Sequence, residues 1–168
     1  MPLPALLARL CTFTESNSDH LGGDLYLTAT GRRSLERGTR NALQLADRFI
    51  VFARDRSGSM YGYWRYNGRS LDAAPLVYLN DEGQDNTVLA NTLEEFLIVI
   101  AVGQHYLGLV DKWDEGERPD EDTLRYRDWL RADVGIETPT LDQARSIVAR
   151  ARASHPDLDA WLDQALGL

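Results

Sequence analysis

The sequence has a single cysteine, Cys11, and only three histidines in 168 residues. One cysteine cannot form an intramolecular disulfide, so the sequence indicates a reducing compartment and we expect a cytoplasmic protein. The histidines, His20, His105 and His155, lie far apart, and none belongs to an HxxxH or HExxH pair. The sequence therefore predicts no metal site, and we expect each histidine at the surface or at a helix end.

The sequence also lacks a hydrophobic run of the length that a membrane span needs. Its N-terminal apolar run, residues 3–10, is too short for a span and lacks the basic leader and cleavage pattern of a secretory signal. The four leucines of this run fall on one face of a helix. We therefore expect no membrane contact and a first helix that packs on the rest of the domain.

Basic residues are outnumbered, with 18 Lys and Arg against 26 Asp and Glu, which leaves a formal charge of −8. This balance opposes approach to phosphate backbones and anionic lipids, so nucleic-acid binding is not expected. The simplest meaning of the charge is a solvated surface that favours solubility. The more specific interpretation is that this negative charge attracts a basic partner.

The length and composition predict one α+β domain over residues 1–168, with its best-defined core at 49–101 and a helical extension at 111–168. Residues 14–25 are polar and contain glycine, which predicts a loop, and residues 32–47 fit neither a helix nor a strand. Strands are expected at the following ranges: 25–28, 49–54, 59–66, 75–79 and 88–90. The DRSG sequence after residue 54 predicts a hairpin loop between the second and third of these strands.

Helix starts are marked by capping residues and prolines. Thr92 with Glu95, and Thr140 with Gln143, match the S/T-x-x-E/Q capping box. Pro119 marks the start of another helix, and Pro156 separates a last one. Each predicted helix carries an apolar stripe that needs a neighbour, so we expect the C-terminal helices to pack on the sheet or on one another.

The search for catalytic groups finds only turns and solvated charges. Gly22-Gly23 lacks the setting of a phosphate loop, and Ser57-Gly58-Ser59 lacks the pattern of a nucleophile elbow. Asp81 and Glu82 are adjacent carboxylates in a turn, and the acidic segment 111–122 lacks the spacing of a calcium loop. We expect no catalytic residue and no cofactor.

Strand alternation divides the aromatic residues of 59–66 between two faces. Tyr61 and Tyr63 share one face, whereas Trp64 and Tyr66 share the other, and we expect Trp64 in the core. The tyrosines either cover the sheet edge or, if they are exposed, serve as contact anchors at a protein interface. The predicted partner-binding residues are Asp55, Tyr61, Tyr63, Asp81, Glu82 and Asp85.

The order of these segments resembles the SUKH superfamily, which includes bacterial immunity proteins and homologues of a fungal cell-wall regulator. The resemblance covers about a third of the chain. The matching residues are Phe52, Gly58, Trp64, Pro75, Val77, Leu79, Glu82, Gly83, Thr92, Glu95, Phe96 and Leu97. Residues 14–47 do not show the family's N-terminal L-P and N-G elements, and the helices after Val110 exceed its core.

The resemblance implies a curved antiparallel sheet of about four to six strands with helices packed against it, no enzymatic activity, and binding to other proteins. Many bacterial members neutralise a toxin encoded next to them. An acidic inhibitor suits a basic toxin, because opposite charges speed association. We therefore expect an immunity protein for a cognate toxin. The alternatives are a cytoplasmic adaptor domain without a toxin and, with least support, a small enzyme.

Overall fold

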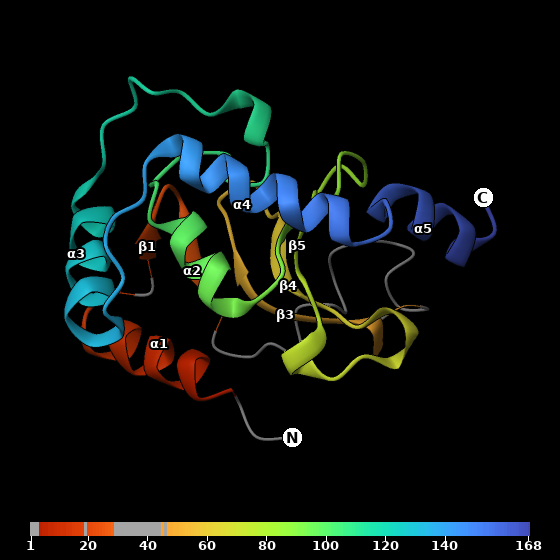
Figure 1. The fold of residues 1–168 in the computed structure, drawn as a ribbon, viewed down its shortest axis with the longest axis horizontal. Helices are drawn as coiled ribbons and strands as arrows, with labels where there is room; N and C mark the ends of the chain where they lie inside the picture. Colours follow the sequence, from red (N-terminus) through yellow and green to blue (C-terminus); the bar gives the residue numbers. More distant parts are fainter. Residues whose placement is uncertain (1–3, 19, 29–44, 46) are drawn as a thin grey trace.

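The computed structural model describes residues 4–18, 20–28, 45 and 47–168, and most of the unassigned interval 32–47 lies outside them. Six strands form one open sheet in the order β1-β2-β3-β4-β5-β6, and every neighbouring pair is antiparallel. The strands are β1 (His20–Gly22), β2 (Leu25–Leu27), β3 (Phe49–Arg54), β4 (Met60–Trp64), β5 (Leu76–Leu79) and β6 (Thr87–Ala90). The α+β class and the antiparallel sheet are confirmed (Figure 1).

The predicted hairpin of β3 and β4 is present, with Phe49 opposite Trp64 and Arg54 opposite Met60. Gly62, opposite Val51, allows the two backbones to approach, since a Cβ atom there would lie 2.3 Å from the carbonyl oxygen of Ile50. The aromatic strand can therefore pair closely with its neighbour.

Both faces of the sheet are buried from β3 to β6. Tyr61 and Tyr63 of β4 point into one core, whereas Met60 and Trp64 point into a second core on the opposite face. The same alternation continues through β5, and in β6 Val88 belongs to the second core whereas Leu89 and Ala90 belong to the first. The expectation that Trp64 belongs to the core is confirmed, and its 0% exposure shows complete burial.

Three helices from separate parts of the chain cover the Tyr61 face. They are α1 (Ala5–Ser16), α2 (Leu93–Ile100) and α3 (Glu121–Trp129). Phe13 of α1 stacks on Trp129 of α3, with ring centroids 5.0 Å apart. On the opposite face lies α5 (Leu158–Leu166), whose Trp161 meets Trp64 edge-on at 5.2 Å.

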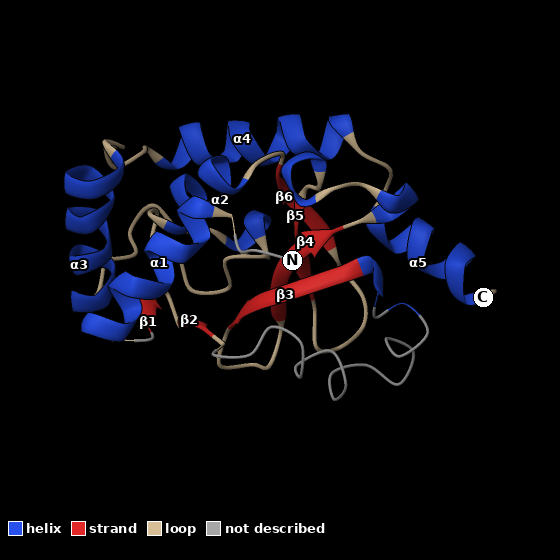
Figure 2. Cartoon of the chain, turned by 90° about the horizontal axis from the view of Figure 1, so that it is seen from below, coloured by secondary structure: helices blue, strands red, loops and turns tan. Residues whose placement is uncertain are grey.

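The predicted helical extension is an integral part of the fold. Helix α4 (Leu141–Ser154) packs against β6 at the edge of the sheet (Figures 1 and 2). Its Ile147 and Val148 belong to the core on the Tyr61 face, whereas Ala151 belongs to the opposite core. The helix therefore joins both cores around an edge that would otherwise expose apolar side chains.

The capping residues act largely as predicted. Thr140 and Gln143 form a complete box, in which the Thr140 hydroxyl accepts from Gln143 N at 3.1 Å and the Gln143 side chain accepts from Thr140 N at 2.8 Å. The Thr92 hydroxyl accepts from Glu95 N at 3.2 Å. The Glu95 carboxylate, however, accepts from Asn91 N at 2.9 Å, one residue before the cap.

One local prediction is wrong. The interval 14–25, predicted as a loop, contains the end of α1 and all of β1. A three-residue strand that ends in two glycines carries too little alternation to be read from sequence, and its pairing with β2 supplies the missing support. No helix in the described part of the chain is long and apolar enough to cross a membrane.

Candidate protein-binding surface

The meander places three hairpin turns at one end of the sheet, because alternate connections of an antiparallel sheet fall on the same side. The turns are residues 22–25, 55–59 and 80–86, and the loop 103–112 packs beside them. We call these four segments the turn end. Arg56 and Asp24 join the first two turns through an ion pair of 3.1 Å, and Ser59 Oγ donates to Asp81 Oδ1 at 3.0 Å between the second and third.

Asp55 lies at this end, but both oxygens of its carboxylate accept hydrogen bonds from its own hairpin. Oδ1 accepts from Ser57 N at 3.0 Å, from Ser57 Oγ at 2.6 Å and from Ser59 N at 3.1 Å. Oδ2 accepts from the Tyr61 hydroxyl at 2.9 Å. Because the residue is only 8% exposed, the prediction that Asp55 contacts a partner is wrong. It is a structural group of the β3–β4 turn.

Tyr61 and Tyr63 are 0% and 2% exposed, so neither is available as a contact anchor. Tyr61 packs against Phe96 of α2, and Tyr63 packs against Phe52 of β3. Burial raises the pKa of Tyr61 well above its usual value and that of Tyr63 to about 12. The prediction of a contact role is wrong because helices cover both faces of β4.

Asp81 makes hydrogen bonds within the turn end and is also accessible to a partner. Its Oδ1 accepts from Ser59 Oγ, and its backbone N–H donates to the same hydroxyl oxygen at 3.1 Å. The residue is nevertheless exposed. Ser59 Oγ also lies 3.2 Å from the hydroxyl oxygen of Tyr78, whose pKa is raised by burial. Asp81 thus connects the surface to a buried hydroxyl network.

Glu82 and Asp85 are exposed, and their carboxylates make no hydrogen bond or ion pair with the described residues. The turn that carries them is nevertheless well ordered by amide contacts. Asn80 N donates to Asn86 Oδ1 at 2.8 Å, and Glu82 N donates to Asn80 Oδ1 at 3.1 Å. These two carboxylates are the predicted site residues that best suit contact with a partner.

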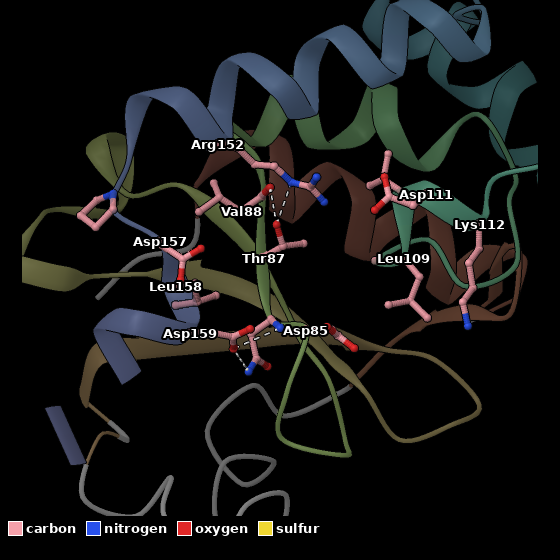
Figure 3. A pocket seen from close by; sticks show the side chains of 14 residues that line it. Asp85, Thr87, Val88, Leu109, Asp111, Lys112, Arg152, Asp157, Leu158 and Asp159 are labelled. Carbon is pink, nitrogen blue, oxygen red and sulfur yellow. Dashed lines mark hydrogen bonds between the residues drawn. The ribbon is translucent and has the colours of Figure 1, made fainter. Parts of the chain in front are cut away.

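A hollow of about 470 Å³ lies beside this turn, between β6, the loop 103–112 and the junction of α4 with α5 (Figure 3). Its wall is held by Asn86 Nδ2, which donates to Asp159 Oδ1 at 2.6 Å, and by Arg152 Nε, which donates to Thr87 Oγ1 at 2.9 Å. The charged lining residues are Asp85, Asp111, Asp157, Asp159, Lys112 and Arg152. Carboxylates outnumber cations, so the hollow continues the negative surface of the turn.

Hydrogen bonds and a close packing contact hold the loop 103–112 against the domain. Gln104 Nε2 donates to the Asp114 carbonyl at 2.9 Å, and Trp113 Nε1 donates to the Leu107 carbonyl at 3.1 Å. Gly108 lies on the Tyr78 ring, since a Cβ atom there would be only 2.1 Å from a ring carbon. The loop is therefore a fixed part of the turn end.

Sequence reasoning missed two residues of this loop. Asp111 is exposed and lines the hollow, whereas Tyr106 is 65% exposed at the tip. Asp111 belongs to the acidic segment 111–122, which the sequence predicts as solvated charges, and Tyr106 belongs to no periodic pattern. Whether the Tyr106 ring is exposed depends on the tertiary fold, so the sequence alone does not show it.

Comparison of the chain with protein-family models, with curated proteins and with solved structures finds no match. Within the described residues, no group of three or more His, Cys, Asp and Glu side chains is arranged to hold a metal. What the turn end offers chemically is a rigid, negatively charged surface with a hollow beside it. Such a surface can attract and orient a positively charged macromolecule.

Proposed function

We propose that this chain is a protein-binding domain of the SUKH type that neutralises a cognate bacterial toxin by direct binding through the turn end. The observation that carries the proposal is the group of exposed, unpaired carboxylates on that rigid end, namely Glu82, Asp85 and Asp111. The SUKH resemblance of residues 49–101 supports the toxin as the class of partner.

The charge distribution suits a fast inhibitor. A formal charge of −8 attracts a basic protein from a distance, and local carboxylates orient it on arrival. Steered association of this kind reaches about 10⁸–10⁹ M⁻¹s⁻¹ at low salt and slows as ionic strength rises. Because hydrogen bonds hold the β5–β6 turn, binding orders little additional backbone.

The first experiment uses the protein encoded beside this chain, produced as an inactivated toxin. Co-expression of the active form with this chain should restore growth. The purified pair should associate at a rate that falls steeply with added salt. If the chain neither restores growth nor binds the neighbouring product at low ionic strength, the immunity function is wrong.

Matched charge reversals test the place of binding. Glu82→Lys with Asp111→Lys should slow association about tenfold, because two attractive charges at the contact become repulsive. The control is Asp128→Lys with Asp133→Lys, which changes the net charge by the same amount on two exposed residues. Thr123, near the start of α3, packs at Gly22 of the turn end, whereas these two residues lie toward the other end of that helix. An equal loss in both variants would show that only net charge matters and would remove the turn end from the proposal.

Lys112 supplies an independent footprint, since it is the only lysine in the sequence, is exposed and lines the hollow. An amine-reactive reagent should label it in the free protein and label it far less in the complex, with the N-terminal amine as internal reference. Equal labelling in both states would place the partner elsewhere.

A further inference from the structure

We infer that Tyr106 is the aromatic contact by which the turn end holds a basic protein partner, an inference that rests on the protein-binding function proposed above. The residue lies at the tip of the loop 103–112, outside every group predicted from the sequence. Four observations lead to it: its exposure, its backbone conformation, the fixed loop that carries it, and the charge around it.

Tyr106 is the exception among the tyrosines of this chain. All seven lie in the described part, and the other six are buried or half-buried, whereas Tyr106 is 65% exposed. A ring in water gives up the free energy that burial provides. Tyrosine is, however, among the residues that most often dominate binding at protein interfaces, where its ring is buried by the partner.

The backbone of Tyr106 is strained, with a φ of 55°. This left-handed conformation suits glycine or asparagine and is unusual for a bulky side chain. It is held by a turn in which Leu109 N donates to the Tyr106 carbonyl at 2.8 Å. The fold thus keeps a tyrosine where a smaller residue would be more stable, as is common at binding sites.

The residues on either side of Tyr106 fix the backbone that carries its ring. His105 N donates to Glu117 Oε1 at 3.1 Å, and the His105 ring contacts Glu117 and lies 3.6 Å from Asp24. On the other side, Gly108 is pressed on the Tyr78 ring. A contact residue on such a loop loses little conformational freedom on binding, which favours affinity.

The charge around the loop identifies the kind of partner. Leu109 and Asp111 of the same loop line the acidic hollow together with Asp85. Carboxylates recruit arginine and lysine side chains, and the face of a tyrosine ring attracts the same cations. The complementary partner is therefore a basic protein that presents arginine or lysine to the Tyr106 ring.

The test measures affinity for the inactivated product of the neighbouring gene. Tyr106→Asn removes the ring and supplies a residue that tolerates a φ of 55°, so we expect an unchanged or higher melting temperature. The dissociation constant should rise at least about thirtyfold, as for loss of a dominant contact. Tyr106→Phe keeps the ring and should remain within about threefold of wild type. Leu124→Ala, which truncates another exposed apolar residue, should not change the affinity.

The outcomes separate this inference from the function on which it rests. Binding by wild type with equal affinity for Tyr106→Asn overturns the role of Tyr106 and leaves the immunity function standing. A loss in Leu124→Ala as large as that in Tyr106→Asn also overturns it, because exposed apolar area would then matter anywhere. Absence of wild-type binding overturns the proposed function and this inference with it.

Discussion

The β3–β4 and β5–β6 turns lie at the same end of the sheet and carry similar residues, yet their carboxylates have opposite roles. Asp55 is buried and accepts four hydrogen bonds from its own hairpin. Glu82 and Asp85 are exposed, and amide groups hold their turn instead. Because asparagine side chains satisfy the backbone of the β5–β6 turn, Glu82 and Asp85 are not needed as acceptors within it.

The largest expected effect comes from Asp55→Ala, which should lower the free energy of unfolding by about 3 kcal/mol, because buried donors of Ser59 and Tyr61 lose their acceptor. Chemical denaturation measures the change. Asp55→Asn keeps one acceptor oxygen and should lie between Asp55→Ala and wild type. A loss of less than about 1 kcal/mol for Asp55→Ala would end the contrast between the two turns.

Asp81→Ala should cost about 1 kcal/mol, since the carboxylate accepts a single hydrogen bond, from Ser59, and is itself exposed. The same denaturation series tests this value. Ser59→Ala is the matched variant, and a double-mutant cycle isolates the contact between the two side chains. A cost equal to that of Asp55→Ala would mean that Asp81 is also purely structural.

A smaller, pH-dependent effect is expected at His155, a polar group away from the turn end. Its Nδ1 lies 2.8 Å from the Tyr66 hydroxyl and its Nε2 lies 2.9 Å from Asn91 Oδ1. Burial, reinforced by Arg69, lowers the pKa of His155. The unfolded chain therefore takes up the proton first as pH falls.

The His155 contribution should be complete above about pH 6.5 and should decline as pH drops from there toward the lower pKa of the folded protein. Melting temperature against pH measures this decline. His155→Gln, which does not titrate, should show a flatter profile over the same interval. An unchanged profile would show that His155 is not the group responsible.

The smallest effect on stability is expected from Glu82→Lys with Asp111→Lys, within about 0.5 kcal/mol of wild type, because both residues are exposed and neither carboxylate makes a hydrogen bond or ion pair with a described residue. The measurement is again denaturation, and it also controls the binding experiments with this variant. A large loss would make these carboxylates structural like Asp55 and would abolish the contrast between the turns.

The sequence predicted those features that depend on neighbouring residues. The strands at 49–54, 75–79 and 88–90 and the cap at Thr140 follow from local alternation and spacing, and the structure confirms them. The burial of Tyr61 could not be predicted, because it depends on helices distant in the sequence. A strand with one exposed face and a strand covered on both faces have similar patterns when aromatic residues occupy each position.

The site was predicted only in part for the same reason. Composition placed acidic turns on the surface but could not count the donors around each carboxylate, so Asp55 and Glu82 looked alike. Tyr106 belongs to no periodic pattern, so nothing in the sequence indicates that its side chain is exposed. Side-chain environment, which only the folded chain supplies, separates structural groups from available ones.

The position of α4 on the edge of β6 has a consequence for the chain while it is being synthesised. The last strand ends at Ala90, whereas the helix that covers it begins at Leu141. At about 5–20 residues per second, several seconds of translation separate the two. During that time the apolar edge of a nearly finished sheet faces the cell, so a nascent chain paused between these points is the form most exposed to chaperones and to aggregation.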